Sequence, residues 1–383
     1  MEELLWCGSA KSDLALPLAN GLRYEQSPLK IDYPSKNLLR MNLNENIVMP
    51  LNRVRPIIAK CADEFDPRYY TPELGEGELR TLTNEIAKYS SCSSGSVALG
   101  FGSDQILDLV FAIKFGRSRT KLVTVDPTYS MYSILAQRLG AQVVSIKLAP
   151  STAREPFSLI PKNVVQTSKK SGVKILVLAS PNNPTGIQYP AEEILTIAES
   201  LPDTAIVIDE AYVEYAGYSM SKYLSRNRNL ILVRTFSKAF GLANLRLGYL
   251  LSSDSAFVEK FISEFQYPYP VAGFAVQMAT ELLRRKPLIL EYAEKTKKYR
   301  QELIEGLQRF RNGLSVISRS DANFVVVKSK MARKIAEDLL VRYAIAVKYI
   351  PKMGAESEFL RVTVGSREMN EKLLYSLRRI MAA

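Results

Sequence analysis

Histidine is absent from the 383 residues of the sequence. Without imidazole, Ser-His-Asp and Cys-His nucleophilic catalysis are excluded, as is every metal site built on histidine. General acid–base work then falls to lysine, tyrosine, aspartate or glutamate. This short set of reactive groups favours chemistry that a bound cofactor carries.

Cysteine is scarce, and long apolar runs are missing. Cys7, Cys61 and Cys92 lack metal-ligand spacing, and an odd, sparse set of thiols is typical of a reducing cytoplasm. No apolar run reaches the roughly 18 residues that span a bilayer. The first seven residues are too acidic and too poor in apolar side chains for a signal peptide. We expect a cytoplasmic protein without a membrane partner.

Acidic residues are outnumbered, since 51 Lys and Arg face 39 Asp and Glu, for a net charge of +12. One interpretation is nucleic-acid binding. However, the basic residues are scattered, and no basic run is interleaved with aromatic residues, as platforms for single strands are. We therefore expect a basic enzyme surface that attracts an anionic cofactor and substrate, and no nucleic-acid partner.

The middle of the chain alternates short apolar runs with helical patterns, and 47% of all residues are hydrophobic. Strands are predicted over 96–100, 121–125, 142–147, 174–178, 204–208, 230–233 and 247–251, with helices over 104–113, 130–139 and 191–200. Continuous apolar strands that alternate with helices predict an α/β fold, with a mostly parallel sheet between helices. Ligands of such sheets bind at the carboxyl ends of the strands.

The pattern changes beyond about residue 260. It predicts a long helix over 281–310, a strand over 323–327, a helix over 332–343, a strand over 360–364 and a terminal helix over 368–381. This is a smaller α+β unit. The predicted organisation is an N-terminal arm (1–40) that joins the small domain, a large cofactor-binding domain (41–262) and a small C-terminal domain (263–383).

Lys238 is the most informative residue for function. It follows the strand 230–233 and lies between Thr235 and Ser237 on one side and Arg246 on the other. A lone lysine is usually a solvated surface charge. Beside hydroxyl and guanidinium donors, it fits an amine held next to a phosphate, which is what a pyridoxal-phosphate enzyme needs. Gly241 permits a tight backbone turn in this run.

Asp209 ends an apolar strand, 29 residues before Lys238. Burial there raises the pKa of the carboxylate, and a protonated pyridine ring nitrogen would keep both groups charged. Taken alone, Asp209 fits an ordinary strand-end residue that caps the next turn better than a cofactor ligand. Tyr212, three residues later, could donate a hydrogen bond to the phenolic oxygen of the same cofactor.

Other loops at strand ends supply further candidates. In the proline-fixed loop 180–186, Asn183 could also donate to the phenolic oxygen. Ser103 and Asp104 begin a helix, where free N–H groups suit a phosphate. Tyr129 opens another strand-to-helix turn and could stack on the pyridine ring. Without the rest, each of these also fits an ordinary turn or a partly buried side chain.

Together and in this order, the motifs resemble the fold-type-I pyridoxal-phosphate aminotransferases, and they are most similar to the histidinol-phosphate aminotransferase family. The resemblance covers roughly residues 40–380 and implies an aspartate-aminotransferase-like fold with a seven-stranded sheet. The matching segments are Asn44–Asn46, Arg68–Tyr69, Gly102–Asp104, Asp126–Tyr132, Ser180–Gly186, Asp209–Tyr212, Arg234–Tyr249 and Leu360–Glu368.

The resemblance implies a role for each matching residue. Lys238 would hold the cofactor aldehyde and then move the substrate proton, while Asp209 would pair the ring nitrogen. Arg361 would bind the carboxylate of glutamate or 2-oxoglutarate, with Lys348 and Asn183 also bordering the substrate. The remaining implied contacts are to the cofactor: Asn183 and Tyr212 at its phenolic oxygen, Tyr129 on its ring, and Thr235, Ser237, Arg246, Ser103 and Asp104 at its phosphate. Tyr69 would reach that phosphate from a neighbouring subunit, which implies a homodimer.

The sequence also departs from the family's pattern. Ile47 stands where the family usually has proline, and Asn244 where it has glycine or alanine. The usual N-terminal Pro-Tyr motif is missing, and Tyr24 or Tyr33 could substitute for its tyrosine. Lys348 stands where the family often places an arginine for the substrate phosphate. Lysine keeps the charge but loses the bidentate fork.

The resulting hypothesis is a histidinol-phosphate:2-oxoglutarate aminotransferase of histidine biosynthesis that cycles between pyridoxal and pyridoxamine phosphate. Its expected partners are small amino and keto acids, and no metal is expected. Two enzymes that use the same cofactor remain alternatives: a transaminase of aromatic or other amino acids, and a threonine-phosphate decarboxylase. A cofactor-free basic binding protein is the alternative from a different class.

Overall fold

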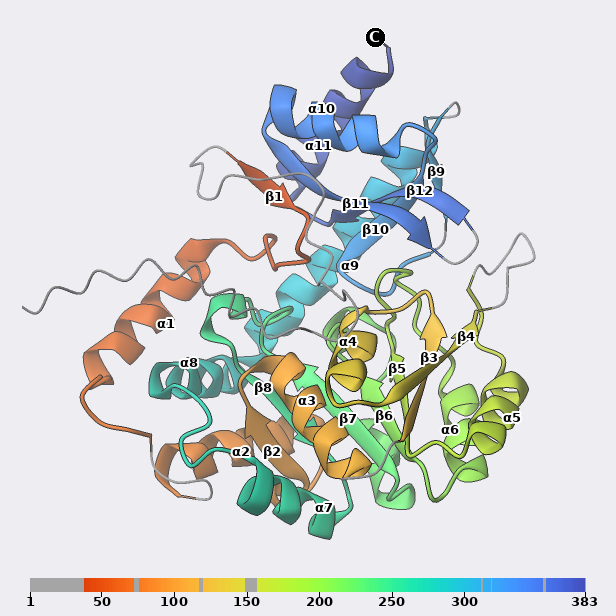
Figure 1. The fold of residues 1–383 in the computed structure, drawn as a ribbon. Coiled ribbons are helices and arrows are strands. Elements are labelled where there is room, and N and C mark those ends of the chain that lie inside the picture. Colours follow the sequence, from red (N-terminus) through yellow and green to blue (C-terminus); the bar gives the residue numbers. More distant parts are fainter. Residues whose placement is uncertain are drawn as a thin grey trace, which may run out of the picture.

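The structure is a computed structural model that describes residues 38–71, 76–116, 120–148, 157–310, 313–317, 319–353 and 356–382. Two sheets organise it: a seven-stranded sheet in the larger body, and a five-stranded sheet in the smaller body drawn above it in Figure 1. Helix α9 (Lys286–Gln308) runs between the two bodies. The predicted pair of a large α/β unit and a smaller α+β unit is confirmed.

The large sheet has the strand order β2-β8-β7-β6-β5-β3-β4. Strands β3 to β7 pair in parallel, and β8 runs antiparallel to both β7 and β2. The predicted mostly parallel, seven-stranded sheet is therefore confirmed. Its strands are β2 (Val97–Gly100), β3 (Lys121–Asp126), β4 (Gln142–Lys147), β5 (Ile175–Ala179), β6 (Ala205–Asp209), β7 (Leu230–Thr235) and β8 (Gly248–Leu251).

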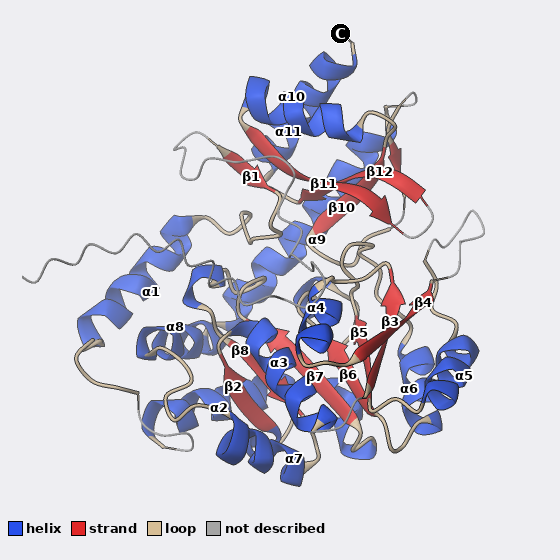
Figure 2. Ribbon diagram, viewed as in Figure 1, coloured by secondary structure: helices blue, strands red, loops and turns tan. Residues whose placement is uncertain are grey.

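Helices cover both faces of this sheet, as Figure 2 shows. Side chains alternate across the central strands: Leu176 and Ile206 lie in one buried cluster, and Val177 and Val207 lie in the other. Because both faces are buried, these strands have continuous apolar sequences. The helices of this body are α1 (Leu51–Glu64), α2 (Gly77–Ser90), α3 (Gly102–Phe115), α4 (Met131–Arg138), α5 (Pro161–Ser171), α6 (Ala191–Ser200), α7 (Ser255–Lys260) and α8 (Gly273–Arg284).

The small sheet has the order β1-β11-β12-β10-β9. Strand β1 (Leu39–Met41), near the start of the described chain, pairs in parallel with β11 (Ile345–Met353). The other strands are β9 (Ser315–Val316), β10 (Phe324–Lys328) and β12 (Glu356–Thr363), and the helices are α10 (Ala332–Tyr343) and α11 (Arg367–Met381). Residues from both ends of the described chain thus build one sheet.

Some predicted elements differ from those observed. The long helix expected over 281–310 is two helices, α8 and α9, because the chain breaks at Arg285 and Pro287 lies in the first turn of α9, where proline is tolerated. Helices α1, α2 and α5 and strand β11 were not predicted. Within the described residues, none of the helices has the length and apolar composition to cross a bilayer. The three-part domain division stays a prediction.

Candidate active site

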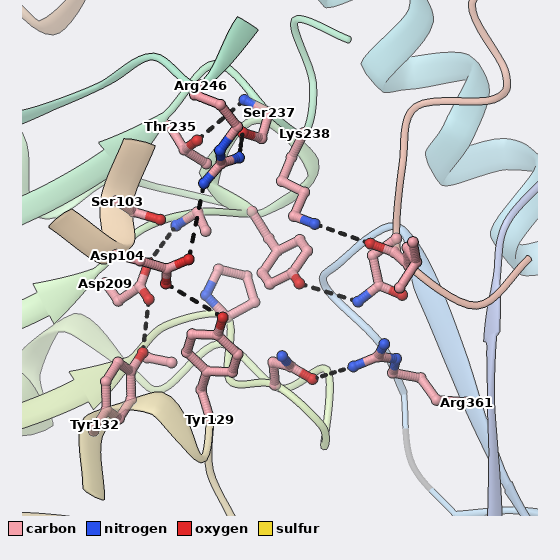
Figure 3. A pocket seen from close by; sticks show the side chains of 17 residues that line it. Ser103, Asp104, Tyr129, Tyr132, Asp209, Thr235, Ser237, Lys238, Arg246 and Arg361 are labelled. Atoms are coloured by element: carbon pink, nitrogen blue, oxygen red, sulfur yellow. Dashed lines mark hydrogen bonds and ion pairs between the residues drawn. The ribbon is translucent and has the colours of Figure 1, made fainter. Parts of the chain in front are cut away.

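A cavity lies at the carboxyl ends of the large sheet's strands and is bordered by Arg361 of the small sheet (Figure 3). Of the residues predicted to form a site, it gathers all except Tyr69 and Lys348. Those lining it are Ser103, Asp104, Tyr129, Asn183, Asp209, Tyr212, Thr235, Ser237, Lys238, Arg246 and Arg361. The strand-end rule therefore located the cavity correctly from the sequence.

Lys238 follows β7 and is partly buried. Its Nζ donates a hydrogen bond of 3.0 Å to the backbone oxygen of Leu43 and lies 5.7 Å from the ring centre of Tyr212. Burial, and then the positive charge of Arg361, lower the pKa of the Lys238 ammonium to about 8. A neutral amine, which is the nucleophilic form, is therefore accessible near neutral pH.

Asp209, at the end of β6, is buried and accepts two hydrogen bonds. The Tyr132 hydroxyl donates to its Oδ2 over 2.7 Å, and the Ala211 N–H donates to its Oδ1 over 3.0 Å. Burial raises the pKa of the Asp209 carboxyl to about 6, although both donors act in the opposite direction. A cation at this carboxylate would reverse that effect, which fits the ring nitrogen of a pyridinium.

A cup of donors lies where β7, β8 and the start of α3 meet. Arg246 Nη1 donates to Ser237 Oγ over 3.3 Å, and Thr235 Oγ1 accepts from the Ser237 N–H over 3.1 Å. A Cβ added at Gly248 would lie 3.0 Å from Ser103 N, so only glycine lets β8 approach the helix start this closely. The first N–H groups of a helix have no partner within it. Together these donors suit a phosphate.

The third part of the cavity joins the two sheets. Arg361, on β12, donates from Nη1 to Asn183 Oδ1 over 2.6 Å and from Nη2 to the Asn42 backbone oxygen over 2.9 Å. Asn44 Nδ2 donates to the Tyr212 hydroxyl over 3.0 Å. The side chains of Asn183, Asn44 and Tyr212 line the cavity together with Arg361, which Figure 3 labels. An arginine here can bind a carboxylate, and Asn183 and Tyr212 can bind an oxygen of a ring.

Tyr129 lines the cavity, and its hydroxyl donates to Asp104 Oδ1 over 3.3 Å. Its ring stands edge-on to that of Tyr132, with centres 5.6 Å apart. The second tyrosine was missed from the sequence. The signal that could have found it is spacing, since residues three apart at a helix start lie on one side of the helix.

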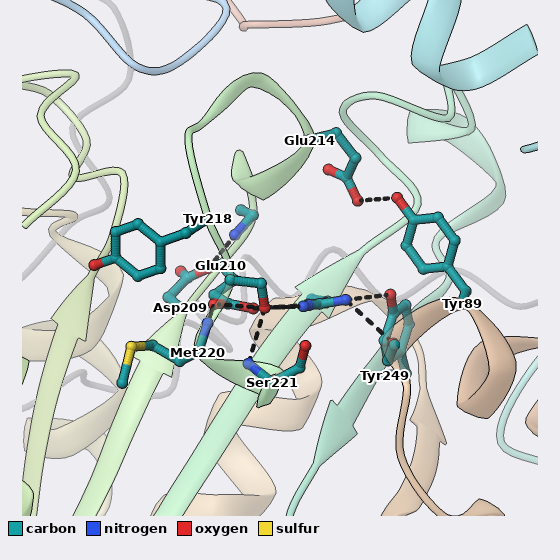
Figure 4. A network of polar contacts seen from close by, with 12 residues as sticks. Tyr89, Asp209, Glu210, Glu214, Tyr218, Met220, Ser221 and Tyr249 are labelled. Carbon is teal, nitrogen blue, oxygen red and sulfur yellow. Dashed lines mark hydrogen bonds and ion pairs between the residues drawn. The ribbon is translucent and has the colours of Figure 1, made fainter. Parts of the chain in front are cut away.

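A buried ion pair joins Arg234 to Glu210, next to strand ends that line the cavity; Figure 4 shows the polar contacts around Glu210. Arg234 Nε donates to Glu210 Oε2 over 2.8 Å, and the two side chains are only 4% and 2% exposed. Arg234 Nη1 also donates to Ser90 Oγ over 3.1 Å, and the Met220 N–H donates to Glu210 Oε1 over 2.6 Å. Because Glu210 follows Asp209 and Arg234 precedes Thr235, this pair ties together two strand ends that carry site residues.

Two predicted site residues lie apart from the cavity lining. Tyr69 is 74% exposed, with the Arg68 guanidinium 5.7 Å from its ring centre. Lys348 lies on β11 directly opposite Arg361 of β12. Cross-strand partners project from the same face of a sheet, so Lys348 neighbours the cavity's arginine. Tyr24 and Tyr33 lie outside the described residues.

The donor set fits pyridoxal phosphate in each of its parts. Lys238 offers an amine to the aldehyde, and Asp209 a carboxylate to the ring nitrogen. The close packing that Gly248 permits holds the phosphate donors in one cup. The residues present thus match a cofactor with an aldehyde, a basic ring nitrogen and a phosphate.

Comparisons with known proteins agree with this chemistry. Residues 37–377 match the family model for aminotransferases of class I and II. Two curated relatives are histidinol-phosphate aminotransferases. The one from Caldanaerobacter subterraneus subsp. tengcongensis is 31% identical over 79% of this chain and 82% of its own. The second such enzyme of Archaeoglobus fulgidus is 30% identical over 93% of this chain and 97% of its own.

A solved structure shows the same fold. The histidinol-phosphate aminotransferase from Sinorhizobium meliloti, in complex with pyridoxal-5'-phosphate, superposes with a TM-score of 0.82 at 24% identity. The match covers 98% of this chain and 99% of that one.

Proposed function

Since the chain belongs to the family of class I and II aminotransferases and is a pyridoxal-phosphate-dependent transaminase, we propose that it transfers the amino group of glutamate to imidazole-acetol phosphate. The product is histidinol phosphate, and the pathway is histidine biosynthesis. The observation that carries this proposal is the single cavity that joins Lys238, Asp209 and a phosphate cup to Arg361 of the small sheet. The names of the curated relatives support the substrate.

When bound, the cofactor supplies an aldehyde for amines and a protonated ring that delocalises the negative charge left by proton loss. Lys238 Nζ would hold the cofactor through that aldehyde, and, once a substrate amine has displaced it, the free Lys238 amine would hold and move the proton of the substrate's α-carbon. A lowered pKa suits the amine to both tasks. Asp209 would pair with the ring nitrogen as a carboxylate and would keep that nitrogen protonated.

The other proposed roles are positioning. Thr235, Ser237, Arg246 and the Ser103–Asp104 turn hold the cofactor phosphate, while Asn183 and Tyr212 hold its phenolic oxygen and Tyr129 packs on its ring. Arg361 binds the substrate carboxylate in a bidentate way. This fixes the α-proton within reach of Lys238 and lowers the entropy that the reaction must otherwise lose.

Lys348 is proposed to bind the phosphate of the substrate. It lies opposite Arg361 on the same face of the small sheet, so two cations lie side by side there. Lys348→Ala should raise KM for imidazole-acetol phosphate about tenfold or more and leave the half-reaction with glutamate nearly unchanged. Lys348→Arg should retain the low KM. An equal loss in both half-reactions would contradict this role.

The substrate proposal is tested with a panel of amino donors and keto acceptors that includes imidazole-acetol phosphate. A preference for unphosphorylated aromatic acids would favour a transaminase of aromatic amino acids. Carbon dioxide release from O-phosphothreonine would favour a threonine-phosphate decarboxylase. Lys238→Ala should bind the cofactor without the absorbance band of the lysine-bound form and should lose turnover. Near-normal transamination by that variant would contradict the proposed chemistry.

The proposal includes a homodimer in the cytoplasm. Tyr69 and Tyr70 are 74% and 79% exposed, and Tyr70 stacks on Tyr269 with ring centres 4.4 Å apart. Tyr267, two residues before Tyr269 in the sequence, is also exposed. An exposed aromatic cluster supports contact with a second copy, which would bring Tyr69 to the neighbouring phosphate cup. Sedimentation velocity tests the dimer.

Free thiols at Cys61 and Cys92 support a reducing compartment.

A further inference from the structure

We propose that Asn44 is a positioning residue that fixes the direction of the Tyr212 hydroxyl proton and so links the small sheet to the phenolic oxygen of the cofactor. The inference rests on the proposed role of Tyr212. Asn44 belongs to the segment 42–46, which connects β1 of the small sheet with α1 of the large body and passes over the cavity.

Every polar group of Asn44 has a hydrogen-bond partner. Its side chain is buried, and its backbone is left-handed, with a φ of 56°. Its N–H donates to Thr363 Oγ1 over 3.0 Å, and its backbone oxygen accepts from Asn323 Nδ2 over 3.0 Å. Asparagine is among the few residues that adopt this backbone conformation readily. The segment is therefore held in one place from both sides.

Thr363 fixes which way the Asn44 amide points. Its hydroxyl oxygen accepts from the Asn44 N–H, so its hydroxyl proton is available for Asn44 Oδ1, 3.3 Å away. With Oδ1 accepting, the Nδ2 end faces Tyr212 and donates to its hydroxyl oxygen over 3.0 Å. In the opposite amide orientation, Thr363 Oγ1 would face two N–H donors of Asn44, and the Thr363 proton would lose Oδ1 as its acceptor.

The direction of this bond decides what Tyr212 can do. A phenol has one proton to donate, and its oxygen accepts other bonds. Because Asn44 donates to the Tyr212 oxygen, the Tyr212 proton is not used by Asn44 and can point into the cavity. Tyr212 is buried and lines the same cavity as Lys238, Asp209 and Arg361. The proton is thus available to the oxygen of a bound cofactor.

The same segment meets the arginine proposed to bind the substrate carboxylate. Arg361 lies two residues before Thr363 on β12, and its Nη2 donates to the backbone oxygen of Asn42, two residues before Asn44. A carboxylate that binds Arg361 therefore acts on the segment that also carries Asn44, the residue that holds Tyr212. Substrate binding at Arg361 can therefore affect the hydrogen bond that Tyr212 donates to the cofactor's phenolic oxygen.

The test is Asn44→Asp, which keeps the shape and tolerates the backbone conformation but replaces the donor with an acceptor. The new carboxylate would accept the hydrogen bond of the Tyr212 hydroxyl. That hydroxyl would then no longer donate to the phenolic oxygen of the cofactor. The readout is the pKa obtained by titrating the absorbance of the lysine-bound cofactor in the full-length protein. Loss of a donor to an ionised oxygen should raise that pKa by about one unit and weaken cofactor binding about tenfold.

Asn323→Asp is the matched control, because it introduces the same charge at a buried asparagine of the same contact without touching Tyr212. Thr363→Val is an uncharged second variant that releases the Asn44 amide, and it should shift the pKa in the same direction by a smaller amount. In a Tyr212→Phe background, Asn44→Asp should add no further shift beyond that of the Asn323 control, since the two residues act as one unit.

Two results would overturn the inference: an Asn44→Asp shift no larger than that of Asn323→Asp, or a shift that persists undiminished in the Tyr212→Phe background. Failure of the proposed function looks different. In that case the unaltered protein would show no absorbance band that depends on Lys238, and both proposals would fall together.

Discussion

The Tyr132 hydroxyl donates a 2.7 Å hydrogen bond to Asp209 Oδ2, and both side chains are buried. The bond joins the first turn of α4 to the end of β6. Burial raises the pKa of the Tyr132 phenol well above its usual range, so this group stays protonated and can only donate to the carboxylate. Tyr132 thus stabilises the ionised form of Asp209, which is the form that a pyridinium needs.

Tyr132→Phe removes only this donor. Loss of a hydrogen bond to a charged group should weaken pyridoxal-phosphate binding by roughly 10- to 100-fold. The pKa of Asp209 should rise further, so cofactor binding should begin to fail at a higher pH than in the unaltered protein. Equilibrium dialysis across a pH series measures both effects.

Tyr189→Phe is the control for Tyr132→Phe. The Tyr189 side chain is also buried, and among the described residues its hydroxyl has no hydrogen-bond partner. Its removal should leave cofactor affinity unchanged. Equal affinity losses in the two variants would show that Tyr132 acts through general packing alone.

The pKa of Lys238 predicts how fast the cofactor-free protein takes up pyridoxal phosphate. With a pKa of about 8, roughly a tenth of the amine is neutral at pH 7. The rate of attachment should therefore rise about tenfold per pH unit below pH 8 and level off above it. Stopped-flow absorbance measures this profile. A rate that still rises tenfold between pH 9 and 10 would show an unshifted lysine.

Asp209 should destabilise the cofactor-free protein. Its folded-state pKa of about 6 exceeds the ordinary 3.8, so the folded protein holds this proton more tightly than the unfolded chain does. This tighter proton binding stabilises the folded state at low pH, and the stabilisation is lost as the pH rises from about 4 through about 6. Above that range, the buried charge costs up to about 3 kcal/mol.

Asp209→Asn should therefore raise the Tm of the cofactor-free protein at pH 8 while weakening cofactor binding. The gain should shrink at pH 5, where much of the native Asp209 is already protonated. Differential scanning calorimetry at both pH values measures the difference. A gain of the same size at both pH values would mean that relief of a buried charge is not its cause.

The buried ion pair between Arg234 and Glu210 should stabilise the fold. Glu210→Ala leaves the buried Arg234 guanidinium without its carboxylate partner, which should destabilise the fold by about 3–5 kcal/mol. Arg228→Ala is the matched control, because its ion pair with Asp254 is largely exposed and should contribute at most about 1 kcal/mol. Urea unfolding measures both. Comparable losses would contradict the special role of burial.

The sequence predicted the features that local pattern and strand ends determine. The seven strands of the large sheet, and Lys238, Asp209 and Arg246 at or beyond their ends, lie where expected, because apolar runs and loop chemistry are local signals. Tyr132 was missed because its role depends on Asp209, a partner on another element. Asn44 was noted only as part of a motif, since Tyr212 lies 168 residues away from it along the chain.

Two differences between the predicted and the observed helices also have physical reasons. The expected helix 281–310 divides because Arg285 leaves helical geometry, which the apolar pattern on either side does not reveal. Helix α1 has Pro56 in its interior, a residue that argues against a helix when only the sequence is considered. In the structure, tertiary packing of its buried face outweighs that local preference.

The pairing of Leu39 with Ile345 has a consequence for synthesis on the ribosome. Strands that lie between these residues emerge and can form the large sheet while the small sheet still lacks its central strands. Strand β1 can pair only after β11 has been synthesised, so this last loop closure spans most of the polypeptide. The segment 42–46 gains its hydrogen bonds to Thr363 and Arg361 of the small sheet only then. Nascent chains should therefore acquire a folded core well before they acquire a competent catalytic centre.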